Sequence, residues 1–198
     1  MASKTEIANR ALSKLGQPRV SNIETTNTKP ARTINQMWNS VRDAMLQMNP
    51  WNFAVKRVSL APDATAPAWG WTYAYTMPAD FLGLYRIRYN PDYEFEGKKI
   101  LTDEGETIYI QYISSVTDTA SYSASFSEAL AARLAFEAAE EITQSNTKKA
   151  QLERDARLAL DEALRADAVE NPVEPQEDDE WVKARLENAK VLSTTEFL

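Results

Sequence analysis

Apolar residues recur at helical spacing through the first 50 residues, and this pattern predicts two helices. The first begins at Ser3, which forms a capping-box pattern with Glu6, and it ends before Gly16. The second begins near Pro30 and ends at Pro50. Its apolar positions are spaced four and three residues apart, which predicts a narrow seam facing other helices. These positions are Ile34, Trp38, Val41, Met45 and Met48.

The spacing changes after Trp51 to the two-residue alternation of β-strands. Alternation over 71–77 and 85–89 predicts strands with aromatic residues on one face. In the second strand Tyr85, Ile87 and Tyr89 share one face. A strand near 53–60 is also predicted, and its apolar residues change phase, so it requires a β-bulge near Lys56-Arg57. Residues 51–112 hold 13 of the 19 aromatic residues, which favours a separate β unit.

Two glycines in this region indicate tight turns. Gly97 follows Glu96, and Gly105 follows Glu104. They predict two hairpins that join strands near 93–96, 99–102 and 107–113.

Helical spacing returns at Ser125, which with Glu128 predicts a second capping box, and it continues to about residue 143. A polar break over 144–147 precedes a fourth helix. Alanine is frequent in both helices and permits close approach of their axes. We expect Trp38 of the second helix to pack against Leu130 or Leu134 of the third.

The predicted fold class is α+β: a four-helix bundle with an aromatic-rich antiparallel β insertion between helices 2 and 3, followed by an extended C-terminal arm. Helices 1 and 2 occupy 1–50, the β insertion 51–120, helices 3 and 4 121–168, and the acidic arm 169–198.

Composition excludes several kinds of chemistry. The 198 residues include no Cys and no His, so the chain has no disulfide, no thiolate or imidazole metal ligand, no Cys nucleophile and no His base. The five glycines are too scattered to form a phosphate-binding loop. We therefore expect no enzyme activity and no catalytic, cofactor or metal site.

The chain contains no run of about 18 apolar residues and no apolar signal-peptide core, so we expect a soluble protein made without export. Its net charge is −7, and six acidic residues near the C-terminus leave only −1 for the remainder. They are Glu170, Glu174, Glu177, Asp178, Asp179 and Glu180. Such a chain has no basic footprint that would hold nucleic-acid phosphates.

An aromatic strip in the β region is open to three interpretations. Trp69, Trp71, Tyr73 and Tyr75 could form the core of the β unit, a subunit interface or a platform for sugars. Alternation on one face favours the core.

Arg86 and Arg88 point the same way from one strand. This indicates a solvent-facing polar face, with a partner contact as the second interpretation. The possible interface residues are Trp69, Trp71, Arg86 and Arg88.

Two groups of carboxylates are candidates for catalysis or cation binding. Glu140 and Glu141 are adjacent on a helix and should diverge. The cluster at 177–180 lacks the spaced ligands and the turn glycine of a calcium loop. Both groups are expected to be solvated.

Several strings resemble a known family. The first helix reads EIANRALSKLGQP over 6–18, and the second ends in PWNFA over 50–54 with Lys56-Arg57 after it. The β region contains AYTMPADFL over 74–82 and IQYI over 110–113, followed by VTD over 116–118. In this order, across residues 4 to 165, the strings resemble the tail tubular protein A family of short-tailed bacteriophages.

The resemblance implies a structural virion protein, the adaptor or gatekeeper of the head-to-tail connector. Subunits of such a protein form a ring, expected to be dodecameric on assembly, beneath the portal protein, and the tail nozzle protein attaches below. Duplex DNA passes through the ring during genome ejection without specific binding, and no membrane is involved. The expected location is the virion tail, with the host cytoplasm during assembly. Two alternatives stay open: a carbohydrate-binding or carboxylate-only glycosidase module, and a generic helical assembly protein.

The segment 170–198 is predicted to be a docking arm, disordered in the free subunit and ordered when it binds the portal or a neighbouring subunit. Its large apolar residues are the candidate partner-binding residues: Trp181, Leu186, Val191, Leu192, Phe197 and Leu198. The alternative is a dispensable tail whose Trp181 folds back onto its own bundle.

Overall fold

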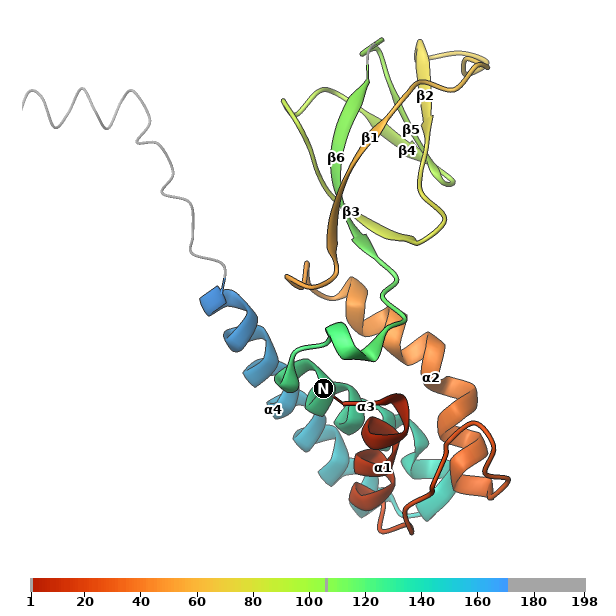
Figure 1. The fold of residues 1–198 in the computed structure, drawn as a ribbon, viewed down its shortest axis with the longest axis vertical. Helices are drawn as coiled ribbons and strands as arrows, with labels where there is room; N and C mark the ends of the chain where they lie inside the picture. Colours follow the sequence, from red (N-terminus) through yellow and green to blue (C-terminus); the bar gives the residue numbers. More distant parts are fainter. Residues whose placement is uncertain (1, 106, 171–198) are drawn as a thin grey trace, which may run out of the picture.

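The computed structural model describes residues 2–105 and 107–170. The described residues form a mixed α+β fold with four helices and two small antiparallel sheets. Helices α1 (Lys4–Lys14) and α2 (Lys29–Gln47) precede six strands, and α3 (Ala124–Thr143) and α4 (Asn146–Glu170) follow them. Figure 1 shows the helices gathered in one part of the molecule and the strands in another.

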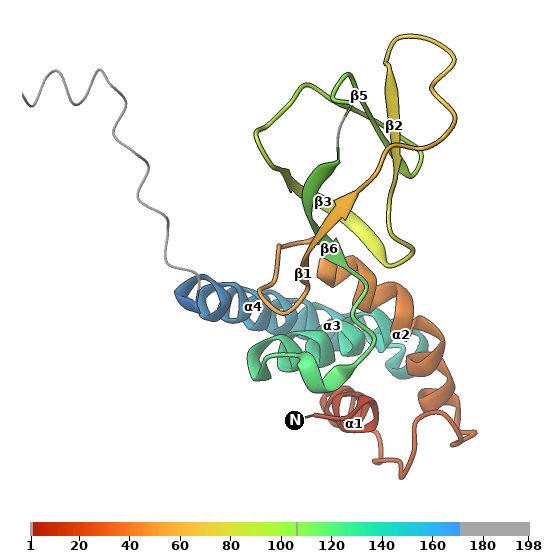
Figure 2. The same cartoon turned by 45° about the horizontal axis from the view of Figure 1, so that its top comes forward.

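The helical part is organised around α3, which contacts the three other helices. Figure 2 shows α3 between α1 and α4. Trp38 of α2 is 2% exposed and lies in one buried core with Leu130 and Leu134 of α3, as the seam predicts. We call this cluster the helical core. The alanines of α3 allow this packing because small side chains let neighbouring axes approach.

The ends of α1 follow the sequence signals. Ser3 and Glu6 form the predicted capping box. At the other end Gly16 has φ +73°, and the amide of Gln17 donates to the carbonyl of Leu12 at 2.9 Å. This is a Schellman-type end, which favours glycine because a positive φ strains other residues.

The strands form two three-stranded sheets. One has the order β1-β6-β3, with β1 (Val55–Leu60), β6 (Ile108–Ser114) and β3 (Phe81–Ile87). The other has the order β2-β5-β4, with β2 (Tyr73–Thr76), β5 (Lys99–Thr102) and β4 (Glu94–Glu96). Residues of both sheets, among them Tyr75, Ile100 and Ile110, share a second buried cluster, which we call the β core. The hairpin between β4 and β5 turns at Gly97, as predicted.

Four aromatic rings join the two parts, and we call them the junction cluster: Trp51, Phe53, Tyr122 and Phe126. The Phe126 ring lies 4.9 Å from Trp51, 5.0 Å from Phe53 and 5.1 Å from Tyr122, measured between ring centroids. Trp51 is fully buried, and its Nε1 donates to the carbonyl of Met45 at 2.9 Å. The chain therefore leaves the helices and returns to them through one buried contact.

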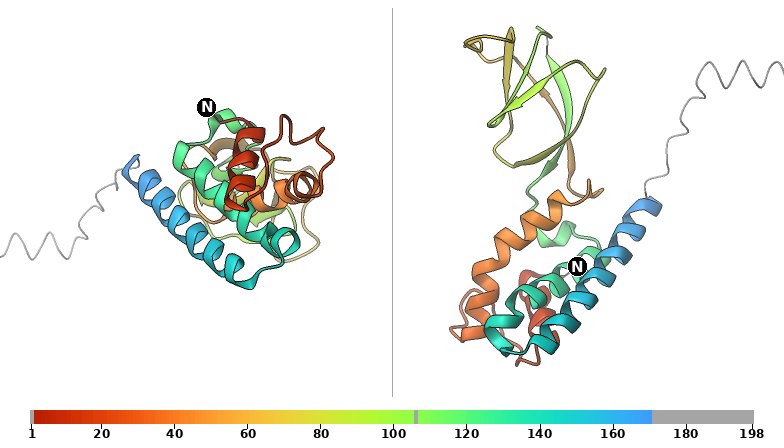
Figure 3. Two further views of the ribbon diagram at one scale, coloured as in Figure 1. Left: turned by 90° about the horizontal axis from the view of Figure 1, so that it is seen from below. Right: turned by 180° about the vertical axis from the view of Figure 1, so that it is seen from behind.

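Asp167, near the end of α4, holds that helix against the start of the β unit. Its Oδ1 accepts from the amide of Asn52 at 3.0 Å, and its Oδ2 accepts from Nδ2 of Asn49 at 3.1 Å. Asp167 is only 8% exposed. Figure 3 shows the end of α4 at the level of the base of the β unit.

The predicted start of the third helix is wrong. Ser123, not Ser125, is the N-cap of α3, and its Oγ accepts from the amide of Phe126 at 3.2 Å. Glu128 makes no capping box; its carboxylate pairs with Lys14 at 2.7 Å and with Arg10 at 3.4 Å. Contact with α1 outweighs the local capping signal.

The bulge predicted near Lys56-Arg57 is also wrong, because β1 pairs with β6 without a register shift. Phe53 precedes the strand and packs in the junction cluster. The direction of its side chain therefore does not require a bulge in β1. The register shifts lie in β3, between Phe81 and Gly83 and between Leu84 and Arg86.

The second shift in β3 changes the predicted face of one aromatic residue. Tyr85 is 51% exposed, whereas Ile87 is 6% exposed and lies in the β core. The two therefore do not share a face.

The second predicted hairpin does not form, because β5 and β6 lie in different sheets. Two residues that follow β5, Glu104 and Gly105, contact tyrosines of β2. The hydroxyl of Tyr75 donates to the carbonyl of Glu104, and a Cβ at Gly105 would lie 2.7 Å from the ring of Tyr73. Glycine is needed there for close approach to a ring, not for a hairpin turn.

Substitution of Trp38 tests the helical core. Trp38→Ala should lower the free energy of unfolding by about 3–5 kcal/mol, because it removes a buried ring and leaves a cavity. Trp69→Ala is the matched control: Trp69 is 87% exposed, so its loss should change stability by less than about 0.5 kcal/mol. Urea denaturation measures both, and a Trp38→Ala midpoint near wild type would contradict the packing.

Candidate functional site

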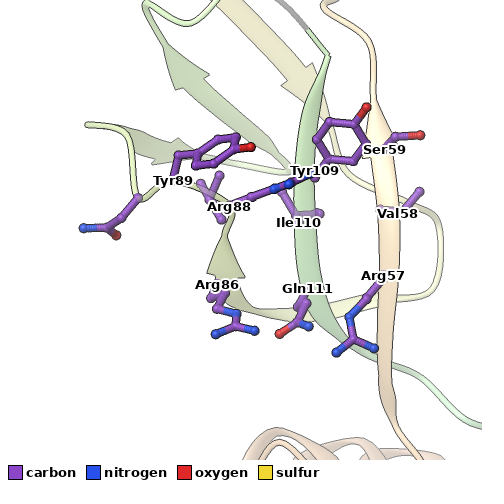
Figure 4. Close-up of a pocket in the computed structure, with 11 residues that line it drawn as sticks. Arg57, Val58, Ser59, Arg86, Arg88, Tyr89, Tyr109, Ile110 and Gln111 are labelled. Carbon is purple, nitrogen blue, oxygen red and sulfur yellow. The ribbon is translucent and has the colours of Figure 1, made fainter. Parts of the chain in front are cut away.

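The outer face of the β1-β6-β3 sheet carries a row of polar side chains. Arg57 on β1 pairs with Gln111 on β6, and Gln111 pairs with Arg86 on β3. Residues paired across antiparallel strands project from the same face. Figure 4 shows the three side chains next to one another across the strands.

A second row lies farther from the helices. Ser59 pairs with Tyr109, and the amide of Arg88 donates to the carbonyl of Tyr109 at 2.9 Å. The guanidinium carbon of Arg88 lies 4.7 Å from the ring centroid of Tyr89 and 5.6 Å from that of Tyr109. These are cation–π contacts, and they hold the Arg88 side chain over the sheet. We call the two rows together the arginine face: Arg57, Arg86, Arg88, Gln111, Tyr89, Tyr109 and Ser59.

The positive charges of this face have no acidic partner among the described residues. Among the described residues, Arg57, Arg86 and Arg88 form no ion pair, and no acidic residue lines the hollow of about 710 Å³ that they border. Gln111 keeps only 8% of its surface exposed, and within the described part of the chain its amide has no hydrogen-bond partner. Among the described residues no buried polar side-chain atom lacks a partner, so the Gln111 amide reaches solvent through the hollow, and a ligand atom there would replace water.

The chemistry of the face is that of anion binding. Guanidinium groups present several N–H donors in a plane and match carboxylate or phosphate oxygens. Arg57 and Arg86 lie on either side of β6, about 10 Å apart at the backbone because neighbouring strands are separated by about 4.8 Å. An anion above Gln111 can therefore reach both.

The sequence identified part of this face. Arg86 and Arg88, predicted to share a polar face, both belong to it. Arg57 and Gln111 were missed, because their position beside Arg86 depends on pairing between strands 25 residues or more apart in the chain. The alternation around Arg57 in β1 was the one available signal.

Trp69 and Trp71 do not belong to this face. Trp69 is 87% exposed, whereas Nε1 of Trp71 donates to Oε2 of Glu94 at 2.9 Å. Tyr75, from the same predicted strip, is fully buried. The strip therefore divides among solvent, a surface hydrogen bond and the β core, and it presents no continuous platform for a sugar.

The remaining candidate residues are placed as follows. Glu140 pairs with Lys149, whereas Oε1 of Glu141 accepts from Oγ1 of Thr33 at 2.9 Å, so the two carboxylates diverge as predicted. Within 2–105 and 107–170, no three acidic side chains converge to hold a metal ion. The predicted arm residues from Trp181 to Leu198 lie outside the described residues.

A second polar cluster, centred on Asp80, is structural. Asp80 accepts from Nζ of Lys56 at 2.7 Å and from the hydroxyl of Tyr112 at 2.9 Å. The hydrogen bond with Lys56 is the main cause of a lowered pKa at Asp80, which partial burial opposes. Burial, with the bond to Asp80, raises the pKa of Tyr112 to about 12, so its hydroxyl stays a donor at neutral pH.

Comparison with known proteins adds no relative: no protein-family model matches the chain, and no curated protein matches it. In the described part of the chain, no helix is both long and apolar enough to cross a membrane.

The Asp80 cluster predicts a specific pH dependence. The pKa of Asp80 is lower in the folded state than the value of about 3.9 for an unfolded chain. Its contribution to stability is therefore complete above that value and is lost as pH falls through the lowered pKa. Asp80→Asn should be less stable than wild type at pH 6, and this difference should shrink below about pH 4.

Urea midpoints measured from pH 6 to pH 2.5 check this prediction. Asp161→Asn, at an exposed carboxylate of α4 that makes no ion pair with any described residue, is the matched control and should follow wild type throughout. A difference between Asp80→Asn and wild type that does not depend on pH would contradict the role assigned to Asp80.

Proposed function

We propose that this protein is a structural virion protein, an adaptor subunit of the head-to-tail connector of a short-tailed bacteriophage. In this proposal a ring of subunits joins the portal protein to the tail nozzle protein and forms part of the DNA exit channel. The protein has no catalytic role.

The observation that carries the proposal is where the family-like strings lie. The string PWNFA supplies Trp51 and Phe53 to the junction cluster. The string VTD includes Val116, whose carbonyl accepts from the hydroxyl of Tyr122 at 2.6 Å. Strings with defined places in the architecture are stronger support for shared ancestry than strings on a variable surface.

Two further strings meet in the Asp80 cluster. AYTMPADFL contributes Asp80, and IQYI contributes Tyr112, which are hydrogen-bonded at 2.9 Å. Four strings that are distant in the chain thus supply contacts that hold the β unit to the helices and to itself. This supports the adaptor family over a generic helical assembly protein.

The division of the fold into two parts suits an adaptor. In this proposal the four helices form a bundle that packs beside its neighbours in the ring, and the β unit contacts a ring above or below. The β unit has its own core and a basic outer face, so it can present a surface without disturbing the bundle.

The charge of the chain suits a DNA channel. The net charge of −7 reduces attraction between the lumen and passing phosphates, so duplex DNA can slide. The three arginines of the arginine face are too few to hold a duplex against this background.

Assembly should depend on the portal. The exposed helical surface offers no long heptad array, so we expect monomers or weak oligomers of the free protein. Portal protein, which holds subunits side by side, should produce a ring, and mass photometry with and without portal measures this. A stable ring at nanomolar concentration without portal would contradict the proposal.

The C-terminal arm should carry much of the portal affinity. Deletion of 171–198 leaves the helical core, the β core and the contacts of Asp167 in place, because all of their residues precede 171. We expect this deletion to weaken portal binding at least tenfold through loss of aromatic and apolar anchors such as Trp181. Circular dichroism provides the control for folding, and wild-type portal affinity of the truncated protein would rule out the docking arm.

A further inference from the structure

We infer that the arginine face binds the acidic segment 174–180 of the same chain. The face is a carboxylate-binding site, and its occupant in the free subunit is the run of Glu and Asp that follows α4. This inference goes beyond the adaptor proposal and does not depend on it.

The face lacks a ligand of the kind this segment supplies. Gln111 lines the hollow between Arg57 and Arg86, and its amide, which reaches solvent there, binds no other described residue. Its NH₂ group can donate to a carboxylate oxygen while the guanidinium groups on both sides donate to the same group or to its neighbour. A carboxylate therefore satisfies the amide and both charges at once.

The segment has the complementary charge. Residues 174–180 read EPQEDDE, which places five carboxylates in seven residues, and no Lys or Arg occurs between Arg165 and Lys183. The arginine face presents three cations and no anion from the described residues. The charges of the face and of the segment are therefore complementary.

Helix α4 also ends within reach of the face. Oε2 of Glu170, the last residue of α4, accepts from Nδ2 of Asn52 at 3.4 Å, and Arg57 follows Asn52 by five residues. Five residues of chain span at most about 18 Å, and the seven residues from Glu170 to Glu177 can extend over about 24 Å. The acidic run can therefore reach Arg57 without rearrangement of α4.

The row of Arg57, Gln111 and Arg86 lies at the end of the sheet nearest the helices. Ile113, two residues beyond Gln111 on β6, is part of the helical core. Two residues of strand span about 7 Å, so the row begins just above the helices. The segment need not cross the rest of the sheet to reach it.

The sequence of the segment suits binding along a sheet. Proline has no N–H group for an intrahelical hydrogen bond, and Pro172 and Pro175 stand before the acidic run. Trp181 follows directly after the last carboxylate, and Tyr109 and Tyr89 of the face are 49% and 84% exposed. If the carboxylates bind Arg57 and Arg86, the indole of Trp181 is within reach of the exposed ring of Tyr109.

A nucleic acid is a weaker occupant. The net charge of −7 repels a polyanion at long range, and three arginines neutralise few phosphates. The acidic segment is part of the same chain, and a short connection gives it an effective concentration in the millimolar range, on the order expected for linked modules. A weak carboxylate site is therefore filled by the segment first.

Peptide binding to the full chain tests the inference. The probe is a fluorescein-labelled peptide of residues 170–182, and the key variant is the full chain with Glu177→Gln, Asp178→Asn, Asp179→Asn and Glu180→Gln. This variant should bind the peptide at least tenfold tighter than wild type, because its own segment no longer occupies the face. Raising the salt concentration from 50 to 500 mM should weaken the binding, because close charges are screened.

The control variants separate the face from general charge. Arg57→Gln with Arg86→Gln, added to the neutralised chain, should abolish peptide binding, and since both side chains are exposed and unpaired among described residues, the fold should be retained. Arg19→Gln with Arg32→Gln removes the same charge from exposed positions outside the face and should leave binding unchanged. Equal peptide affinity for wild-type and neutralised chains would overturn the inference. So would tighter binding of a labelled 12-nucleotide single strand than of the peptide.

Distance measurement in the full chain gives a second, independent test. The chain has no Cys, so Ser59→Cys on the face and Gln176→Cys in the segment can carry the only two spin labels. A short-distance population that persists after dilution with unlabelled protein, and that broadens to long distances in Arg57→Gln with Arg86→Gln, is the expected result. A short distance that disappears on dilution would show contact between copies and would overturn binding within one chain. Neither test uses portal protein, so both can fail while the adaptor function stands.

Discussion

The junction cluster determines how the two parts of this protein are held together. Trp51 and Phe53 lie on the outgoing chain, whereas Tyr122 and Phe126 lie on the returning chain, and all four rings contact at centroid distances of 4.9 to 6.3 Å. Edge and stacked contacts between buried rings have preferred geometries, so they orient both connections as well as bury surface. The chain crosses between the helices and the β unit twice. Without packed rings at these two crossings, the β unit could rotate relative to the helices as on a hinge. Together with the hydrogen bonds of Asp167, this contact sets the position of the β unit relative to the helices.

Strand β6 extends this constraint into the sheet. Ile113 packs in the helical core and its neighbour Tyr112 in the β core, because successive residues of a strand face opposite ways. Gln111 then lies on the same face as Ile113, just beyond the cover of the helices, where Arg57 and Arg86 flank it. The arginine face is thus a direct consequence of a strand that begins in one core and ends in the other.

The net charge does not show that positive and negative charges lie in different parts of the chain. A total of −7 describes an acidic protein, yet a run of carboxylates without Lys or Arg follows α4, while three arginines without an ion pair among the described residues gather on one sheet face. In the connector role that we propose, net acidity would ease DNA passage, and the acidic segment would take part in assembly. The total charge bears only on the first of these proposed roles, whereas the second depends on where the charges lie.

Local signals in the sequence determined the order of the elements and the ends of α1. The capping box at Ser3, the glycine after α1 and the two-residue alternation after Trp51 act within a few residues, so they could be interpreted without a fold. They established two helices, an aromatic-rich antiparallel β insertion and two further helices. Only the tertiary structure decided that β5 and β6 belong to different sheets, that Glu128 pairs with α1 instead of capping α3, and that Arg57, Gln111 and Arg86 form one row. Strand register and helix contacts join residues that are distant in the chain. In the sheet, a shift of one residue in register would move Arg57, Gln111 or Arg86 to the opposite face.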